Sequence, residues 1–589
     1  MTVSNRNAFF IIAAAAFAAY ANSFHNPFVF DDGHTIMENA GIRNLADIKS
    51  VFFSPENAGR PLLFLTFALN YAAGGLAPFG YHLVNFILHA ATSFIVFLLL
   101  DAILNREGVA DRRWALAGAL LFAVHPMNVE AVTYISSRSD GLATFLYYSA
   151  FMLVIAAGFR LNGKSLLALA LFAAALLVKE TAVTLPALLT LFVLQFETEN
   201  RKQAAPTLAL FWLMLPFFFL YRMYALGAAL EEKAQQAATP HDYLLTQLTV
   251  VPLRYLPRLF IPINQNVDAD LGIKTTVLDP AVALGGALIV AALIFAFAGF
   301  KRHKIFSFAV LWFLGTLSVT SSFYPILDTY AERRLYIALP AFALAVAYAL
   351  ARLTEARPAA RTAAAAALAV VLALFAVLAI QRNAVFGSAI RLYEDAIAKG
   401  GEKSRMYVGL VDAYEAEGMT EKAEDTLRFA VKAFPGNAPV MLQYCRWLGK
   451  KGDFSGMQRH LGSIQPEFPK EWAQLYNLKG VLAGQAGAYA EGLAWFDKAL
   501  AIDPAHIDSR ANRIILLNMM GRRGEALAMA REAAARWPDK AEYHYQLGVM
   551  LLPESRAAAR GEFQAALAAY PKHGDAMRAM REIEALPDH

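Results

Sequence analysis

Long apolar runs separated by short polar segments fill the chain from residue 8 to about residue 383. A run of roughly 20 apolar residues is long enough to cross a bilayer as an α-helix. Residues 244–262 contain three prolines and two arginines, so we expect an interfacial segment there. The other runs predict about eleven spans, at residues 8–24, 82–101, 114–125, 141–159, 165–179, 181–196, 207–226, 278–299, 305–322, 334–353 and 362–382.

A different period begins after about residue 386, where apolar and polar residues are mixed. Prolines recur at intervals of 34, 35, 34 and 33 residues, at Pro435, Pro469, Pro504, Pro538 and Pro571. A helix–turn–helix unit of about 34 residues that ends in proline is the tetratricopeptide pattern. The sequence therefore predicts an all-α protein: a polytopic membrane helical bundle over 1–385, followed by an α-solenoid of about five repeats over 386–589.

Composition agrees with this division. The chain is 57% hydrophobic, which is too apolar for a soluble enzyme of 589 residues. Its formal net charge is only +5, and its Lys and Arg residues are concentrated in short loops. This distribution indicates membrane topology and argues against a nucleic-acid partner. The single cysteine, Cys445, excludes an intramolecular disulfide.

Charged residues also predict the orientation of the bundle. If the spans alternate, every short basic segment falls on one side, which the positive-inside rule makes cytoplasmic. These segments contain Arg6, Arg106 to Arg113, Arg160 and Lys164, Arg201 and Lys202, Lys301 to Lys304, and Arg357 and Arg361. The other side holds acids mixed with bases and the whole repeat region. We expect a polar cavity that opens on this extracytoplasmic side.

Asp31 and Asp32 lie just beyond the first apolar run. Two adjacent carboxylates at a membrane surface repel each other and lose hydration, so they are a hypothesis for a functional site. The alternative is a solvated turn that ends at Gly33.

Ordered motifs in both halves of the chain resemble those of a known family. They are Arg60-Pro61-Leu62 with Pro78-Phe79-Gly80-Tyr81-His82, then His125-Pro126 with Glu130 and Ser137-Arg138-Ser139-Asp140, then Lys179-Glu180, and finally Ala331-Glu332-Arg333 with Leu335-Tyr336. With Asp31-Asp32 and the repeats, this set resembles the transmembrane and tetratricopeptide-repeat-containing O-mannosyltransferases and their bacterial relatives. That family is similar to the C-type glycosyltransferases. One departure is Arg334, where eukaryotic members tend to have an apolar residue.

The resemblance implies a reaction and a site for it. A sugar would pass from a polyprenyl-phosphate donor to a Ser or Thr hydroxyl of an exported protein, outside a bacterial inner membrane and with inversion. Asp31 would be the base, and Asp32 would orient it or bind the acceptor. Arginine donates paired hydrogen bonds to phosphate, and the predicted phosphate-binding residues are Arg333, Arg334, Lys179, Arg138 and Arg60. The predicted supporting residues are His125, Glu180, Glu332, Asp140 and Tyr336. Structural ion pairs, such as Lys179 with Glu180, are the alternative for each charge.

No cofactor is predicted. His82 and His89 share a helix face and could bind a divalent cation with His125 or Asp140, but their spacing is not a recognised ligand signature. The chain also lacks a phosphate-binding loop of the Gly-x-x-x-x-Gly-Lys type. The expected partners are the lipid-linked donor, membrane lipid, and a protein or peptide acceptor bound by the repeats.

Two other functions fit the same pattern. The chain could be a transferase that acts on a glycan or lipid acceptor, or a non-catalytic membrane scaffold for an envelope assembly. A transporter is less consistent, because the polar groups cluster at one face. An enzyme predicts that Asp31, Arg333, Lys179 and Arg138 converge on one cavity, whereas a scaffold predicts that they are scattered.

Overall fold

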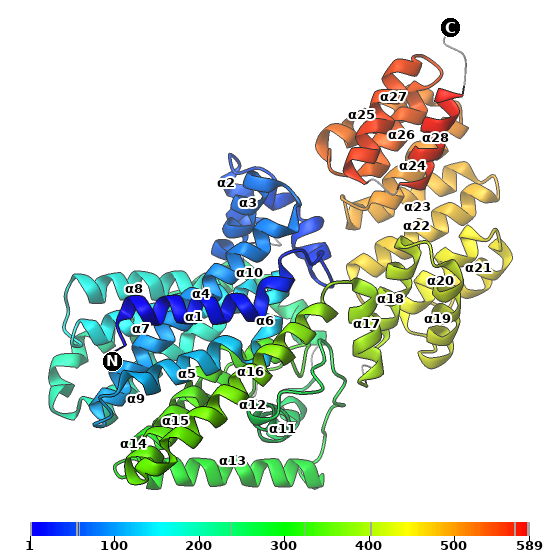
Figure 1. The fold of residues 1–589 in the computed structure, drawn as a ribbon. Coiled ribbons are helices and arrows are strands. Elements are labelled where there is room, and N and C mark those ends of the chain that lie inside the picture. Colours follow the sequence, from blue (N-terminus) through cyan, green and yellow to red (C-terminus); the bar gives the residue numbers. More distant parts are fainter. Residues whose placement is uncertain are drawn as a thin grey trace. The chain divides into compact units, whose positions relative to one another are not determined.

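The computed structural model describes residues 3–54, 57, 59–236, 238–322, 324–400, 403–570 and 573–585, with the backbone alone for 226–236. These residues form helices and no strand, which confirms the predicted all-α fold. The chain divides into two compact units, Met1–Lys403 and Ser404–His589 (Figure 1). The membrane unit is thus Met1–Lys403, and the repeat unit is Ser404–His589.

Seventeen α-helices lie in the described residues of the membrane unit. They are α1 (Asn5–Tyr20), α2 (Ile48–Phe53), α3 (Pro61–Gly74), α4 (Pro78–Arg106), α5 (Arg112–Val124), α6 (Val129–Thr133), α7 (Arg138–Ala156), α8 (Gly163–Leu176), α9 (Leu185–Phe196), α10 (Arg201–Gln236), α11 (Pro240–Val250), α12 (Leu256–Phe260), α13 (Pro280–Ala298), α14 (Lys304–Leu317), α15 (Leu335–Ala356), α16 (Arg361–Val385) and α17 (Ala389–Ala398).

Within the described part of the chain, six helical stretches are long and apolar enough to cross a membrane, or seven if one bent pair counts as a span. The six are Pro78–Arg106, Ile135–Ala156, Thr198–Ala225, Pro280–Ala298, Glu332–Ala356 and Pro358–Val385. Among the other predicted spans, 165–179, 181–196 and 305–322 coincide with apolar helices of 10–17 residues. The chain is an integral membrane protein, and the count of eleven spans stays a prediction.

Local sequence explains where several of these helices begin. Pro78 and Pro280 each occupy the first turn of their helix, where the missing N–H of proline costs nothing. The side chain of Asn162 accepts hydrogen bonds from the amides of Lys164 and Ser165 and so caps α8. The proline-rich segment 244–262 folds as α11, a π-helical turn and α12, and it is not among the candidate spans.

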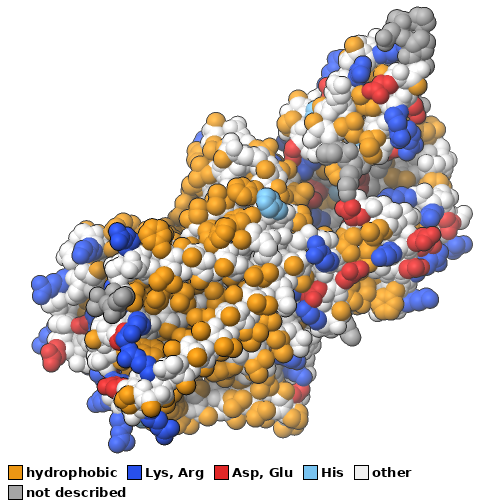
Figure 2. Space-filling model, viewed as in Figure 1, with side chains coloured by type: hydrophobic (Ala, Val, Ile, Leu, Met, Phe, Trp, Pro, Cys, Tyr) orange, Lys and Arg blue, Asp and Glu red, His pale blue; other side chains and the backbone are white. Residues whose placement is uncertain are grey.

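The basic loops gather at one end of the membrane unit. Arg112 donates to the main-chain oxygen of Val3, and Arg106 pairs with Glu197 at 2.8 Å. Three further contacts link different loops and helix ends here: Lys304 with Glu107, Arg361 with Asp111, and Gln203 with Gly158. Figure 2 shows Lys and Arg side chains clustered at the end where the N-terminus lies, next to a broad apolar surface. All the short basic segments of the sequence therefore lie on one side of that surface.

The repeat unit is a series of helix pairs. They are α18 (Ser404–Ala416) and α19 (Thr420–Ala433), α20 (Ala438–Lys450) and α21 (Phe454–Leu461), α22 (Pro469–Gln485) and α23 (Tyr489–Ile502), α24 (Ile507–Met519) and α25 (Arg523–Arg536), and α26 (Ala541–Leu551) and α27 (Arg556–Ala569), followed by α28 (Gly574–Glu584). Pro571, which ends the fifth predicted unit, lies outside the described residues.

Paired helices approach closely where the sequence supplies glycine. A Cβ atom added to Gly480 would lie 2.5 Å from the Phe496 ring, and one added to Gly548 would lie 2.5 Å from the Phe563 ring. The same small-with-aromatic contact thus recurs in the third and fifth pairs, as expected for repeated units that share one continuous core.

The two ends of the membrane unit predict a labelling pattern. Because Cys445 is the single cysteine and is buried, cysteines introduced at exposed positions can be labelled selectively. We expect Lys202→Cys, at the basic end, and Ala46→Cys, in the loop after α1, to react with a membrane-impermeant maleimide from opposite sides. Intact cells and inverted vesicles should therefore give reciprocal labelling. Labelling of both positions from the same side would contradict this arrangement.

Candidate functional site

A cavity of about 250 Å³ lies at the other end of the membrane unit. It is built from the loop after α1, the start of α3, the α6–α7 connection, the turn before α9 and the segment before α15. Four cationic and three acidic side chains line it: Arg60, Lys179, Arg333 and Arg334, with Asp31, Glu180 and Asp328. The described residues of the lining carry one net positive charge. Six of these seven residues belong to the site predicted from the sequence, and the seventh is Asp328.

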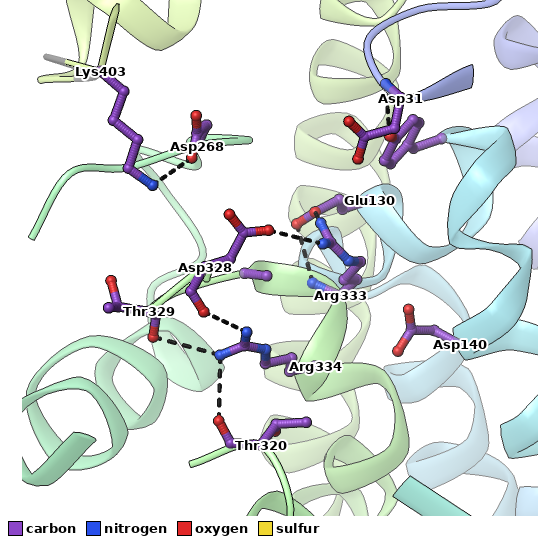
Figure 3. Close-up of polar contacts among 12 residues, drawn as sticks. Asp31, Glu130, Asp140, Asp268, Thr320, Asp328, Thr329, Arg333, Arg334 and Lys403 are labelled. Carbon is purple, nitrogen blue, oxygen red and sulfur yellow. Dashed lines mark hydrogen bonds and ion pairs between the residues drawn. The ribbon is translucent and has the colours of Figure 1, made fainter. Parts of the chain in front are cut away.

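Backbone geometry directs Asp31 into the cavity. Phe30 has a φ of 54°, in the left-handed region that costs a non-glycine residue free energy. Its ring lies 6.0 Å from the Tyr134 ring. The Asp31 amide donates to the Tyr134 hydroxyl oxygen at 2.9 Å (Figure 3). The strained residue and the hydrogen bond together fix Asp31 beside Tyr134, which also lines the cavity.

Asp32 lies outside the cavity lining. Its carboxylate accepts hydrogen bonds from the Val29 amide at 3.1 Å and from the amide and hydroxyl of Ser136. The residue is only 1% exposed, and this burial raises the pKa of its carboxyl to about 7, although the three donors oppose the shift. Asp32 therefore fastens the loop after α1 to the α6–α7 connection.

A helix break places the partner of Arg333. The residue before a proline avoids the α conformation, so α5 ends at Val124, and the chain turns by 52° between α5 and the segment Pro126–Thr133. His125 caps this turn by accepting from the Met127 amide at 3.2 Å. The turn directs Glu130 toward Arg333 of the cavity lining. The Glu130 carboxylate forms an ion pair with the Arg333 guanidinium and accepts from the Arg333 amide at 3.0 Å. Asp328 lies 3.5 Å from the same guanidinium.

Arg334 is held differently. Its guanidinium donates to the main-chain oxygens of Asp328 at 2.5 Å and of Thr320 and Thr329 at 3.4 Å each (Figure 3). Carbonyl oxygens satisfy the N–H groups without neutralising the charge. Arg334 therefore contributes positive charge to the cavity.

The remaining cavity cations are paired with acids. Lys179 contacts Asp140 at 2.6 Å, and both side chains are buried. Glu180 lies between two arginines, at 3.2 Å from Arg60 and 3.6 Å from Arg222. The sequence suggested an ion pair between Lys179 and Glu180 as the alternative to phosphate binding. In the structure these neighbours instead form separate ion pairs, Lys179 with Asp140 and Glu180 with the two arginines.

Besides Asp32 and Asp140, four of the predicted residues do not line the cavity. Arg138 is fully buried and donates to Asn85, Thr66 and the Tyr81 carbonyl. The other three are also buried: His125 hydrogen-bonds the Leu259 carbonyl, Glu332 accepts from the Asn266 amide, and the Tyr336 hydroxyl contacts His89. These residues support the walls of the cavity.

Glu130, Tyr134 and Asp328 contact the predicted site residues but were not predicted to have a role. Glu130 belongs to the same motif as Arg138. A carboxylate within an apolar stretch is itself a sign of a functional site, so the sequence did contain a signal for Glu130. Tyr134 and Asp328 carry no such signal. Among the described residues, no group of three or more His, Cys, Asp or Glu is placed to hold a metal ion.

Three curated proteins that are similar to this chain are all named protein O-mannosyl-transferases. A tetratricopeptide-repeat family model matches residues 473–506. Protein O-mannosyl-transferase Tmtc1 of Drosophila melanogaster is 38% identical over 190 residues, which cover 29% of this chain and 21% of that protein. Tmtc3 of the same fly is 25% identical over 511 residues, covering 70% of this chain and 54% of that protein.

Human TMTC4 is 32% identical over 211 residues, covering 31% of this chain and 28% of that protein. These matches confirm the resemblance to the TMTC O-mannosyl-transferases, although the chain spans about half or less of the length of these relatives. Among solved structures, a tetratricopeptide-repeat protein of Thermus thermophilus aligns with 31% of this chain and 100% of its own, at 19% identity and a TM-score of 0.28.

The raised pKa of Asp32 predicts the pH dependence of stability. Its carboxyl has a pKa of about 7 in the fold and 3.8 as a free group, so the folded state binds the proton more tightly. The resulting stabilisation is complete below pH 3.8 and is lost as the pH rises through 7. We therefore expect the melting temperature of the wild type to fall relative to that of Asp32→Asn between pH 5 and pH 8.

Asp47 provides the matched control. It lies in the same loop, and hydrogen bonds from Ser50 lower the pKa of its carboxyl. Asp47→Asn should track the wild type across this pH range, since the Asp47 carboxyl is ionised above about pH 5 in both the folded and the unfolded chain. A pH-independent difference between the wild type and Asp32→Asn would contradict the assignment.

Proposed function

We propose that this chain is a membrane glycosyltransferase that moves a sugar from a polyprenyl-phosphate donor to a Ser or Thr hydroxyl of a protein. The observation that carries the proposal is the convergence of Asp31 with Arg60, Lys179, Arg333 and Arg334 on one cavity. These residues come from distant parts of the sequence, and a scaffold would not require them to meet. The names of the similar proteins support protein O-mannosyl transfer.

Asp31 is the proposed general base. A hydroxyl group is a weak nucleophile and reacts faster when a positioned carboxylate takes its proton. Direct attack on the anomeric carbon inverts its configuration, with the lipid phosphate leaving from the opposite face. Asp31 would lie on the acceptor side of the sugar and the cations on the phosphate side.

Arg333 and Arg334 are the proposed phosphate ligands. The phosphate of a sugar phosphodiester carries one negative charge and gains a second as the bond to the sugar breaks. A lining with one net positive charge balances the donor, and the guanidinium groups stabilise the additional charge that develops in the transition state. Because Arg333 is held by Glu130 and Arg334 by carbonyl oxygens, both groups are preorganised for this contact.

An apolar groove could hold the hydrocarbon chain of the donor. This second cavity, of about 320 Å³, is lined by residues of the π-helical turn before α12 and of α12 to α15, including Leu288 and Ala292 of α13, Phe313 of α14 and Ala341 of α15. Ala341 lies seven residues after Arg334, about 10 Å along the helix. A lipid whose phosphate contacts Arg334 could therefore extend along α15 into the groove.

The active site and the repeat unit are proposed to lie on the extracytoplasmic side of a bacterial inner membrane. The basic segments gather at the opposite end of the membrane unit, which the positive-inside rule assigns to the cytoplasm. The repeats would bind the acceptor, because stacked helix pairs form an extended concave surface suited to peptides.

Substitution of Asp31 tests the base. Asp31→Asn preserves the size of the side chain but cannot accept the proton, so transfer should fall about 10²–10⁴-fold. The measurement is the release of lipid phosphate from a defined polyprenyl-phosphate mannose in the presence of a hydroxyl peptide. Binding of the donor should be retained.

The control is Asp32→Asn, which changes the neighbouring carboxylate outside the cavity and should lose less activity. Full activity in Asp31→Asn would refute the base assignment, and inactivity in Asp32→Asn alone would reverse the two roles. Transfer to glycan or lipid but not to any peptide would identify a different acceptor class.

Filling the apolar groove tests the donor lipid. Ala292 lines the groove, whereas its neighbour Ala291 is exposed on the same helix and does not. Ala292→Trp should weaken the use of a long-chain donor several-fold more than that of a short-chain donor, because the indole occupies space needed by the chain. Ala291→Trp should leave both unchanged. Equal effects of Ala292→Trp on the two donors would exclude the groove as the chain site.

A further inference from the structure

The loop Asn264–Asp268 is bonded to the end of helix α17. Asn266 Nδ2 donates to the carbonyl oxygen of Ala396 at 3.0 Å, and Lys399 Nζ donates to the carbonyl oxygen of Gln265 at 3.1 Å. Lys403 Nζ pairs with Asp268 at 2.6 Å (Figure 3). The chain continues from Lys403 into the repeat unit, so this loop is fastened to the point where the chain leaves the membrane unit.

The opposite side of the same loop is bonded to the two segments that flank the Arg333–Glu130 ion pair. The Asn266 amide donates to Glu332 Oε1 at 2.9 Å, and Glu332 directly precedes Arg333. Gln265 Nε2 donates to the carbonyl oxygen of Pro126 at 2.7 Å, at the start of the turn that carries Glu130. A displacement of the loop would therefore move both partners of the ion pair.

Burial makes the loop Asn264–Asp268 depend on its hydrogen bonds to the protein. Gln265, Asn266 and Asp268 are each no more than 5% exposed, so their polar groups depend on protein partners. Asn264 begins the loop with a φ of 54°, a left-handed conformation that asparagine adopts more readily than most residues. Asn266 Oδ1 also accepts from the Asp268 amide at 3.0 Å, which closes the loop on itself.

We propose that Asn266 is a positioning residue for Arg333. It ties the end of α17 to Glu332 and so sets the location of the arginine that faces the cavity. The effect of Asn266 on catalysis rests on the proposed function, in which Arg333 binds the donor phosphate. The position of the last residues of the membrane unit and the geometry of the phosphate site then depend on the same few hydrogen bonds.

The first experiment measures the link without reference to activity. The Arg333 amide donates to Glu130 and is protected from hydrogen exchange for as long as that contact is kept. Asn266→Ala removes the side-chain bond to Ala396 but retains the main-chain bond to Glu332. It should accelerate exchange in the segment around Arg333 by up to about tenfold, the effect of losing one buried hydrogen bond.

Two further variants make this result specific. Lys399→Met breaks the tie from the α17 side and should accelerate exchange in the same segment. Gln195→Ala is the matched control, because Gln195 is a buried amide bonded to Ser307 and Phe300 in the membrane unit near the basic loops. It should lower the melting temperature comparably without changing exchange around Arg333. Unchanged exchange in Asn266→Ala, or an equal acceleration in Gln195→Ala, would overturn the proposal.

The second experiment separates this proposal from the proposed function. Binding of a short-chain prenyl monophosphate to the full-length protein should weaken several-fold in Asn266→Ala and in Arg333→Lys, but not in Gln195→Ala. If the exchange result holds while Asn266→Ala binds like the wild type and Arg333→Lys binds weakly, Asn266 does not position the phosphate ligand and the proposal fails. If exchange changes as expected while Arg333→Lys also binds normally, the link stands and the donor assignment fails.

Discussion

The ion pair between Arg333 and Glu130 is the contact on which the cavity depends. It joins the segment before α15 to the segment that comes after the break at the end of α5. The Glu130 side chain is 1% exposed, so removal of the Arg333 side chain would leave a buried charge without its ion-pair partner, at a cost of about 3–5 kcal/mol. The pair exists because Pro126 interrupts a helix and turns Glu130 toward Arg333.

The other polar contacts of the cavity repeat this principle of joining distant segments. Asp32 connects the loop after α1 to Ser136, and Lys179 connects the end of α8 to Asp140 of α7. Glu180 pairs with Arg60, which precedes α3, and with Arg222 of α10. Each of these charges is matched by an opposite charge or by several donors, which allows polar groups to persist beside an apolar bundle. The proposed chemistry uses charges that the fold also needs.

Much of the fold was predictable from the sequence because two periods dominate it. Apolar runs gave the helices of the membrane unit, and the interval of about 34 residues between prolines gave the helix pairs of the repeats. Side-chain direction at turns was not predictable. Asp31 and Asp32 are neighbours, yet the left-handed Phe30 directs one into the cavity and Ser136 holds the other in the wall. Arg138 and Arg333 both stand at the start of a helix, but only Arg333 reaches the cavity.

The cation-rich lining has a consequence for the end of each turnover. Under the proposed function, the lipid phosphate that remains after transfer carries more negative charge than the donor that entered. Groups that stabilise the departing phosphate, Arg334 above all, therefore retain the spent carrier more strongly than they bind fresh donor. Product inhibition by the spent lipid, relieved as it leaves sideways into the bilayer, is the natural limit on the speed of such a site.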